Sequence, residues 1–152
     1  MGAEAIGDLY DEDFTLWTEQ QATLLRRHAA GELTNDAALD WLNLAEEIEA
    51  VGGNTRRELH NQLARLLQHP LKWHYQPDLR SGSRRATIRT QRQEIEDLLA
   101  DNPSLQARLP EFVVAAYPRA RAAALDETGL LELPEQPPFT IEQALVDALP
   151  DG

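Results

Sequence analysis

Apolar residues recur at intervals of three and four along most of the chain, a pattern that predicts amphipathic α-helices. The first helix carries its apolar stripe between Tyr10 and His28 and is expected to end at Gly31. A second helix is predicted to begin near residues 35–40, to direct Trp41, Leu44, Ala45 and Ile48 inward, and to end at the glycine pair 52–53. Glycine adopts the left-handed conformation of a helix C-terminus without a steric penalty, which makes this pair a natural helix stop.

The third predicted helix begins with a capping-box pattern, in which Thr55 and Glu58 satisfy backbone donors of the first turn. Its apolar positions continue until the pattern meets Pro70. A proline inside a helix lacks the N–H that would bond to the carbonyl of Leu66, at a cost of about 3 kcal/mol. The helix is therefore expected to kink or stop near His69.

A fourth helix is predicted to follow Ser83, its expected N-cap, and to end before Pro103. Its apolar stripe consists of Ile88, Ile95, Leu98 and Leu99. Residues 104–126 have a helical pattern again. Pro110 and Pro118 are expected to break this stretch into a short turn of helix and a longer, kinked helix.

The last part of the chain is predicted to be an extended link followed by a short helix. Residues 130–138 contain too many prolines for a helix, and Thr140 with Gln143 forms a second capping-box pattern. No stretch has the alternation typical of a strand. The sequence thus predicts an all-α fold, a single compact bundle of about five to six helices that forms one domain over residues 1–152.

The composition is that of a folded domain, with 42% hydrophobic and 26% charged residues. The chain has no cysteine, which excludes disulfides, thiolate chemistry and a Cys-based zinc site. No apolar run is long enough for a membrane span, and the acidic N-terminal stretch is unlike a secretory signal. We therefore expect a cytoplasmic protein that does not bind a membrane.

Charge is distributed unevenly along the chain. The net charge is −12, yet residues 56–92 contain nine Lys and Arg against only Glu58 and Asp78, so this segment is +7 and the remainder is −19. The basic segment is either a face for an anionic partner or a basic element surrounded by acidic helices. The second interpretation is favoured, because an acidic protein is repelled by a polyanion at long range.

Five segments follow, in order, the pattern of one known family: LDWLNLAEEIEAVG (39–52), LLQHPLKWHYQP (66–77), RRATIRTQRQEIEDLL (84–99), NPSL (102–105) and ETGL (127–130). The chain resembles the bacterial domain-of-unknown-function family number twenty-nine, found largely in cyanobacteria and proteobacteria. The stretch 10–26 is similar to the family's opening helix, so the resemblance covers about residues 8–133 and leaves the link and helix of 134–152 outside it. It implies a compact all-helical domain with no established activity, and so transfers no catalytic residues.

Two positions depart from the family pattern. Pro70 stands where the family helix usually continues with a leucine, and Arg84 stands where a tryptophan is expected. The second departure weakens the prediction of an aromatic pocket near residues 83–88.

Glu46, Glu49 and His69 are the candidate metal ligands. The two glutamates are three residues apart on one helix face, and His69 is expected on a second helix packed antiparallel to it. His69 and Glu49 are also the candidates for acid–base catalysis. The alternative is structural, with both glutamates neutralising Arg85, Arg89 or Arg92 of the basic segment. Neither a nucleophile in a recognisable motif nor a phosphate-binding glycine loop accompanies them.

The stretch HPLKWHYQP (69–77) is the candidate binding segment, because it combines aromatic and basic side chains. Its rings could stack on nucleobases while an arginine stripe on the next helix holds phosphates. The alternative is a helix end that closes the bundle with aromatic rings. The candidate binding residues are Trp73, His74, Tyr75, Arg85, Arg89 and Arg92.

The sequence therefore favours a small cytoplasmic domain without catalysis that binds a protein partner or self-associates, and no cofactor is expected. A metal-dependent hydrolase or nuclease that uses Glu46, Glu49 and His69 is the first alternative. A nucleic-acid binder that uses the Arg85, Arg89 and Arg92 stripe is the second.

Overall fold

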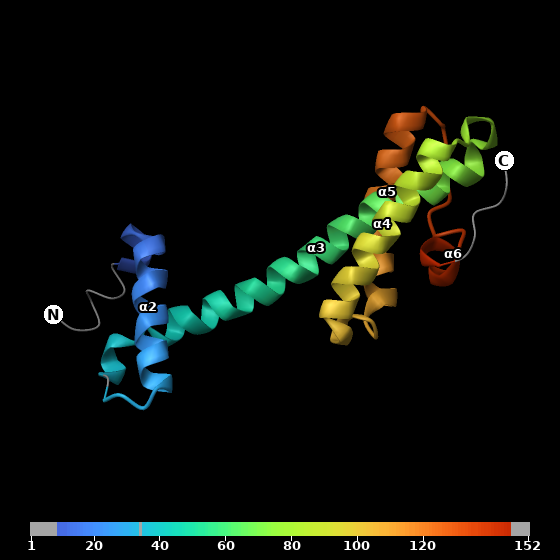
Figure 1. Ribbon diagram of the computed structural model, residues 1–152. Helices are drawn as coiled ribbons and strands as arrows, with labels where there is room; N and C mark the ends of the chain where they lie inside the picture. Colours follow the sequence, from blue (N-terminus) through green and yellow to red (C-terminus); the bar gives the residue numbers. More distant parts are fainter. Residues whose placement is uncertain (1–8, 34, 147–152) are drawn as a thin grey trace. The chain divides into compact units, whose positions relative to one another are not determined.

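The computed structural model describes residues 9–33 and 35–146, and all regular elements in these ranges are helices (Figure 1). The all-α class predicted from the sequence is confirmed. Backbone contacts divide the chain into two compact units, residues 1–53 and 54–152, which are described separately below. Whether the two units fold as the one domain predicted over residues 1–152 stays a prediction.

The first unit contains helical residues 9–12, helix α2 (Phe14–Ala29), the 3-10 helix η1 (Asp36–Ala38) and the beginning of α3 (Trp41–Tyr75). The side chain of Asp13 caps α2 by accepting from the backbone N–H of Leu16 at 3.0 Å.

The predicted stop of the first helix is confirmed. Gly31 follows the end of α2 with a φ of 79°, a left-handed conformation that costs other residues a steric penalty.

Helix α3 is continuous through the glycine pair 52–53, so the predicted break there is wrong. Among the described residues only Gly31 and Gly129 have positive φ, and the glycine pair takes ordinary helical geometry. A glycine inside a helix costs only about 1 kcal/mol relative to alanine, which tertiary packing readily offsets. The predicted capping box of Thr55 and Glu58 is likewise wrong, because both residues lie inside α3.

Pro70 does not stop α3, which continues to Tyr75. The proline is itself buried, and it lies among buried residues that start at Leu59 and end at Trp73. The helical positions of these residues place one apolar face in the core of the second unit. Burial of this face offsets the backbone hydrogen bond that the proline lacks.

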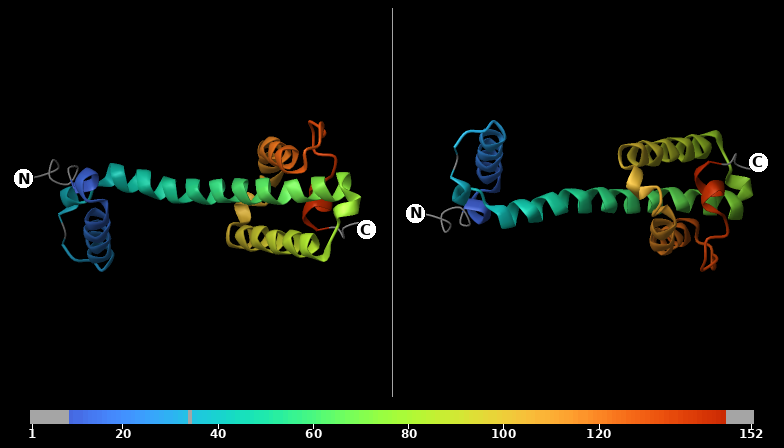
Figure 2. Two further views of the ribbon diagram at one scale, coloured as in Figure 1. Left: turned by 90° about the horizontal axis from the view of Figure 1, so that it is seen from above. Right: turned by 90° about the horizontal axis from the view of Figure 1, so that it is seen from below.

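The second unit contains η2 (Pro77–Leu79), α4 (Gly82–Asp101), η3 (Pro103–Leu105), α5 (Leu109–Thr128) and α6 (Ile141–Leu145). Within this unit α3 lies between α4 and α5 (Figure 2). The core forms where these three helices meet and extends to the link before α6. Its fully buried members include Leu63, Leu66, Leu67, Leu71, Ile88, Ile95, Ala116, Tyr117 and Ala120.

The ends of α4 and α5 differ in part from the sequence-based prediction. Ser81, and not Ser83, caps α4, because its side chain accepts from the N–H of Arg84. Pro110 lies in the first turn of α5, where a missing N–H costs nothing, so it begins the helix and does not break it. Pro118 lies inside α5 without ending it.

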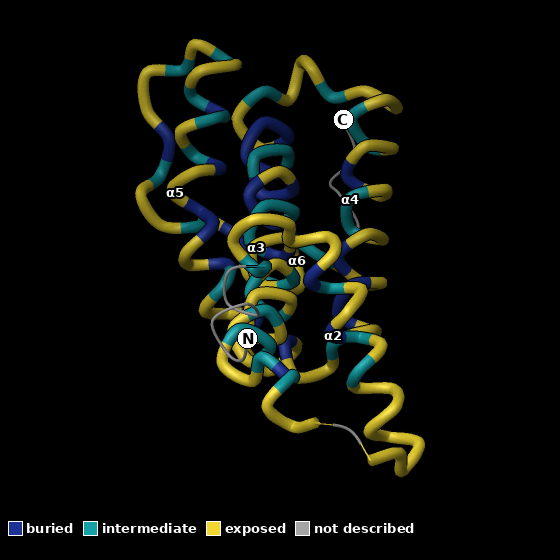
Figure 3. The backbone as a smooth tube through the Cα atoms, turned by 90° about the vertical axis from the view of Figure 1, so that its left-hand side faces the viewer, coloured by how far each residue is buried: buried dark blue, intermediate teal, exposed yellow. Residues whose placement is uncertain are grey.

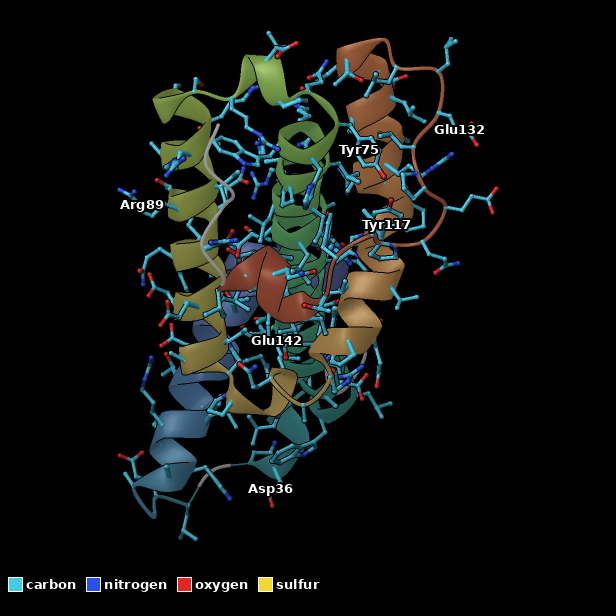
Figure 4. All side chains as sticks on the ribbon, turned by 90° about the vertical axis from the view of Figure 1, so that its right-hand side faces the viewer. Asp36, Tyr75, Arg89, Tyr117, Glu132 and Glu142 are labelled. Atoms are coloured by element: carbon cyan, nitrogen blue, oxygen red, sulfur yellow. The ribbon has the colours of Figure 1, made fainter. Side chains whose placement is uncertain are left out.

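The remaining boundaries are as predicted. Gly129, with a φ of 69°, terminates α5 in a left-handed conformation. The capping box of Thr140 and Gln143 is present at the start of α6, and residues 130–138 form an extended link. Tyr117 fixes this link by donating from its hydroxyl to the carbonyl of Pro134 at 2.6 Å, and its ring lies between α5 and the link (Figure 4).

Candidate functional site

Trp73, the central candidate of the binding segment, belongs to the core of the second unit. Its ring is 2% exposed, and the guanidinium groups of Arg80 and Arg85 lie 5.4 and 5.3 Å from the ring centroid. Arg80 also donates to the backbone carbonyl of Trp73 at 2.8 Å. These cation–π contacts attach the start of α4 to the end of α3. Because the ring is buried, it is not accessible for stacking on a nucleobase.

The other candidate binding residues of the segment are not assembled into one site. His74 and Tyr75 are exposed at the end of α3, and Arg89 is exposed on α4 and points away from it (Figure 4). Arg92 instead binds backbone: it donates to the carbonyls of Ala144 at 2.9 Å and Gln143 at 3.0 Å. A role for these residues in binding a partner stays a prediction.

His69 lies in a cluster of charged groups. Lys72, only 6% exposed, donates its ammonium to the carboxylate of Glu127. Burial lowers the pKa of His69, the positive charges of Lys72 and Arg84 lower it further, and Glu127 opposes them. The hydrogen bond from Lys72 lowers the pKa of Glu127. This arrangement favours the neutral form of His69, which lies beside an ion pair whose lysine is buried and whose glutamate is exposed.

The proposed metal ligands do not lie on two packed antiparallel helices. Glu46 and Glu49 lie in the first unit and His69 in the second, and all three belong to the single helix α3. Within residues 9–33 and 35–146, no group of three or more His, Asp or Glu side chains is placed to hold a metal ion. A metal role for Glu46, Glu49 and His69 therefore stays a prediction, as does their pairing with the arginines of α4.

The second unit has several hollows with room for a ligand, and two of them are each about 460 Å³. One is mainly apolar, with Ile95, Leu99 and Leu145 in its wall. The other lies between α3 and α4 and is lined by the carboxylates Glu58, Glu94, Asp97 and Asp101. Neither hollow is lined by the candidate catalytic residues His69 and Glu49, so the hollows do not support the enzyme alternative.

An aromatic cluster holds the first unit together. The rings of Tyr10, Phe14 and Trp17 pack at centroid distances between 4.8 and 5.7 Å. Trp17 is 1% exposed and its indole N–H donates to Asp40 at 3.1 Å, while the hydroxyl of Tyr10 donates to Glu47 at 2.5 Å. Two side chains of the N-terminal helices are thus bonded to carboxylates at the start of α3.

A buried glutamine completes this attachment. Gln21 is 3% exposed; its amide accepts from the N–H of Asp40 at 2.8 Å and donates to the carbonyl of Ala38 at 3.2 Å. The sequence contained a signal for it, since a polar side chain lies on the apolar stripe of α2 between Trp17 and Leu24. This signal was missed, and with it the role of Asp40.

An apolar stripe, defined here as Trp41, Leu44 and Ile48, follows the first turns of α3. Trp41 is 53% exposed, Ile48 is 71% exposed and Leu44 is half-buried. Val51 continues the stripe at 68% exposure. The spacings of three and four place these side chains on one helix face, next to the face that carries Asp40 and Glu47 toward α2.

The first unit has far less core than the second. Its buried apolar side chains among the described residues are Trp17 and Leu39, whereas the continuous core cluster lies entirely in the second unit (Figure 3). Of the thirteen exposed large hydrophobic side chains in residues 9–33 and 35–146, eight lie in the first unit. A unit with this distribution has most of its apolar surface available for an additional contact.

None of the helices in residues 9–33 and 35–146 combines the length and apolar character required to traverse a bilayer.

Comparison with known proteins identifies a family without an assigned activity. The family model described as "Domain of unknown function DUF29" matches residues 9–149. No curated protein and no solved structure matches the chain. The match covers nearly the whole sequence and confirms the family resemblance seen in its helical segments. The chain therefore belongs to the family of the domain of unknown function DUF29.

Proposed function

We propose that this protein is a non-catalytic interaction domain whose first unit binds a helix of another protein chain through the apolar stripe. The observation that carries the proposal is the exposure of Trp41 and Ile48 in a unit whose described residues include only Trp17 and Leu39 as buried apolar side chains. Covering such a stripe removes apolar surface from water, which contributes about 25 cal/mol per Å².

The spacing of the stripe favours a helix as the bound element. Trp41, Leu44, Ile48 and Val51 follow one another at intervals of three, four and three, the repeat of a helix–helix seam. Ala45 adds little bulk beside the stripe, so a second helix can approach closely. A helix with apolar residues at the same intervals would insert its side chains between those of α3.

The second unit supports a scaffolding role over catalysis. Three of its aromatic and basic candidates, Trp73, Arg85 and Arg92, make internal contacts. Its core is continuous and contains the end of α3. The stripe and this core therefore share one helix.

The test uses the full chain and a designed helical peptide with apolar residues at seam spacing, neutral polar residues elsewhere and no tryptophan. The chain has three tryptophans, of which Trp17 and Trp73 are buried and Trp41 is 53% exposed. Binding at the stripe should shift Trp41 emission to shorter wavelength and protect it from iodide quenching.

Ile48→Ser should weaken binding about tenfold or more, because it removes a central apolar side chain. Leu42→Ser is the matched control: Leu42 is 86% exposed on the same helix but on a different face. Equal loss in both variants, or no binding by any apolar helix, would contradict the proposed function.

A further inference from the structure

We infer that the partner of the apolar stripe is a basic helix of a different protein, and that a second copy of this chain does not occupy the stripe. This inference rests on the proposed function and names the partner class of the same surface. It is drawn from the distribution of charge between the two units and around the stripe.

The acidity of the protein is concentrated in the unit that carries the stripe. Residues 1–53 contain twelve Asp and Glu against two Arg, a net charge of −10. Residues 54–152 contain fourteen Asp and Glu against twelve Lys and Arg, a net charge of −2. An approaching partner therefore meets a strongly negative field at the first unit and a weak one at the second.

Carboxylates lie on both sides of the stripe. At 3.6 residues per turn, Glu47 and Glu49 lie about 100° to either side of its centre. Glu49 is exposed, and Glu47 is half-buried against Tyr10. Neither Lys nor Arg occurs between Trp41 and Gly53, so this part of α3 has no basic side chain of its own to neutralise these groups.

Charge of this sign disfavours self-association through the stripe. Two copies would bring two units of −10 each into contact and would place glutamates beside glutamates along the seam. Like charges at these flanking positions destabilise a helix pair, whereas Lys or Arg on the opposite helix would pair with them. A basic amphipathic helix would cover the apolar stripe with its own apolar face and pair its Lys or Arg side chains with the flanking glutamates.

Three peptides with one identical apolar face test the inference with the full chain. They carry four neutral, four Lys or four Glu residues at the positions that flank the face. At low salt the Lys peptide should bind about three- to fivefold more tightly than the neutral peptide, at about 0.3–0.5 kcal/mol for each of the two pairs with Glu47 and Glu49, and the Glu peptide more weakly. The difference should shrink when added salt screens the charges.

Glu49→Gln should reduce the advantage of the Lys peptide and leave the neutral peptide unchanged. The matched control is Glu94→Gln, at an exposed position of α4, which makes the same change in net charge. It should not change the ratio of the affinities for the Lys and neutral peptides. Equal affinity for all three peptides would overturn this inference and leave the proposed function standing. Failure of all three to bind would overturn both.

Sedimentation of the chain alone completes the test. We expect a monomer at micromolar concentration, for wild type and Ile48→Ser alike. A wild-type dimer that Ile48→Ser dissociates and Leu42→Ser does not would show that a second copy occupies the stripe, which overturns the inference.

Discussion

The ammonium of Lys72 and the carboxylate of Glu127 form an ion pair in which one partner is buried and the other is not. The Lys72 side chain is 7% exposed and that of Glu127 is 58% exposed. The pair joins α3 to the end of α5, across 55 residues of sequence. Removing Glu127 therefore leaves a buried ammonium without a partner, whereas removing Lys72 leaves an exposed carboxylate.

Glu127→Ala should destabilise the protein more than Lys72→Met. The first change leaves a buried ammonium without its acceptor, at a cost of about 1–3 kcal/mol, while methionine fills the lysine's space without a charge and should change stability by less than about 1 kcal/mol. Urea unfolding of both variants measures the difference. The opposite order would mean that the pair is dominated by packing of the lysine stem.

Stability should fall as the pH drops below about 6.5, because the pKa of His69 is lowered by burial and by Lys72 and Arg84. Between the folded and unfolded pKa values the unfolded chain binds more protons, so the stabilisation is complete above the unfolded value and is lost as the pH falls through the folded one. Unfolding midpoints at about pH 7.5 and about pH 5.5 measure the effect.

His69→Gln should reduce this pH dependence, and His74→Gln, at an exposed position five residues away, should not. Identical pH profiles for wild type and His69→Gln would contradict the prediction. Glu127→Gln should lower the pKa of His69 further, because Glu127 raises it.

Tyr10 should ionise late in an alkaline titration. Its hydrogen bond to Glu47, with the nearby carboxylate charges, raises the pKa of Tyr10 to about 12. The stability that this contact contributes should be present below about pH 10 and be lost as the pH rises through the folded pKa. Phenolate absorbance measures the ionisation.

Burial also raises the pKa of Tyr117, so the assignment of the late transition requires variants. Tyr10→Phe should remove one late transition, and Glu47→Gln should move it toward lower pH by removing the charge. An unchanged titration in Glu47→Gln would rule out this carboxylate as the cause.

Trp41 and Trp73 should respond oppositely to truncation, although both lie on α3. Trp73→Ala should cost about 3–5 kcal/mol, because the ring is 2% exposed and covered by two arginines. Trp41→Ala should change stability by no more than about 1 kcal/mol while abolishing binding of an apolar helix. A large loss of stability in Trp41→Ala would show that the stripe is already covered in the free chain.

Periodicity alone predicted most of the helices, because the stripe of an amphipathic helix is a local property. The stripe of Ile88, Ile95, Leu98 and Leu99 is buried as expected, and the capping box of Thr140 is formed. Both signals depend on residues within two turns of one another, so they could be interpreted without knowing the fold.

The predictions that differ from the structure concern helix breakers: the stop expected at the glycine pair 52–53 is wrong, and of the kink or stop expected at Pro70 the stop does not occur. The glycine pair 52–53 and Pro70 each carry a local cost of about 1–3 kcal/mol, and both lie inside α3. For Pro70, the burial that offsets this cost comes from α4 and α5, which are distant in sequence. Local patterns contain no measure of that burial.

The candidate site was predicted only in part, for a related reason. The aromatic and basic residues around Trp73 were predicted to form a binding segment, but the Trp73 ring is buried in the core. The apolar stripe was predicted to face inward, since a helical pattern does not tell a core-facing stripe from an exposed one. The burial of each side chain in the folded first unit is what shows that this stripe is exposed and not core-facing.

Pro118→Ala should stabilise the protein by about 1–3 kcal/mol, because alanine supplies the N–H that bonds to the carbonyl of Val114. Pro118 is exposed, so the substitution removes no packing. Pro70→Ala should gain less, since Pro70 is buried and its ring fills space in the core. Urea unfolding of the two variants side by side measures the contrast.

The guanidinium of Arg92 attaches helix α6 to α4. Helix α6 is five residues long, too short to persist by its own backbone bonds, and Arg92 donates to two of its carbonyls from α4. Amide protons of residues 141–145 should therefore exchange with solvent by detachment of this segment, at a lower free energy than the amides of α3 to α5. Attachment of this segment should depend on Arg92 together with the packing of Ile141, Ala144 and Leu145 against the core.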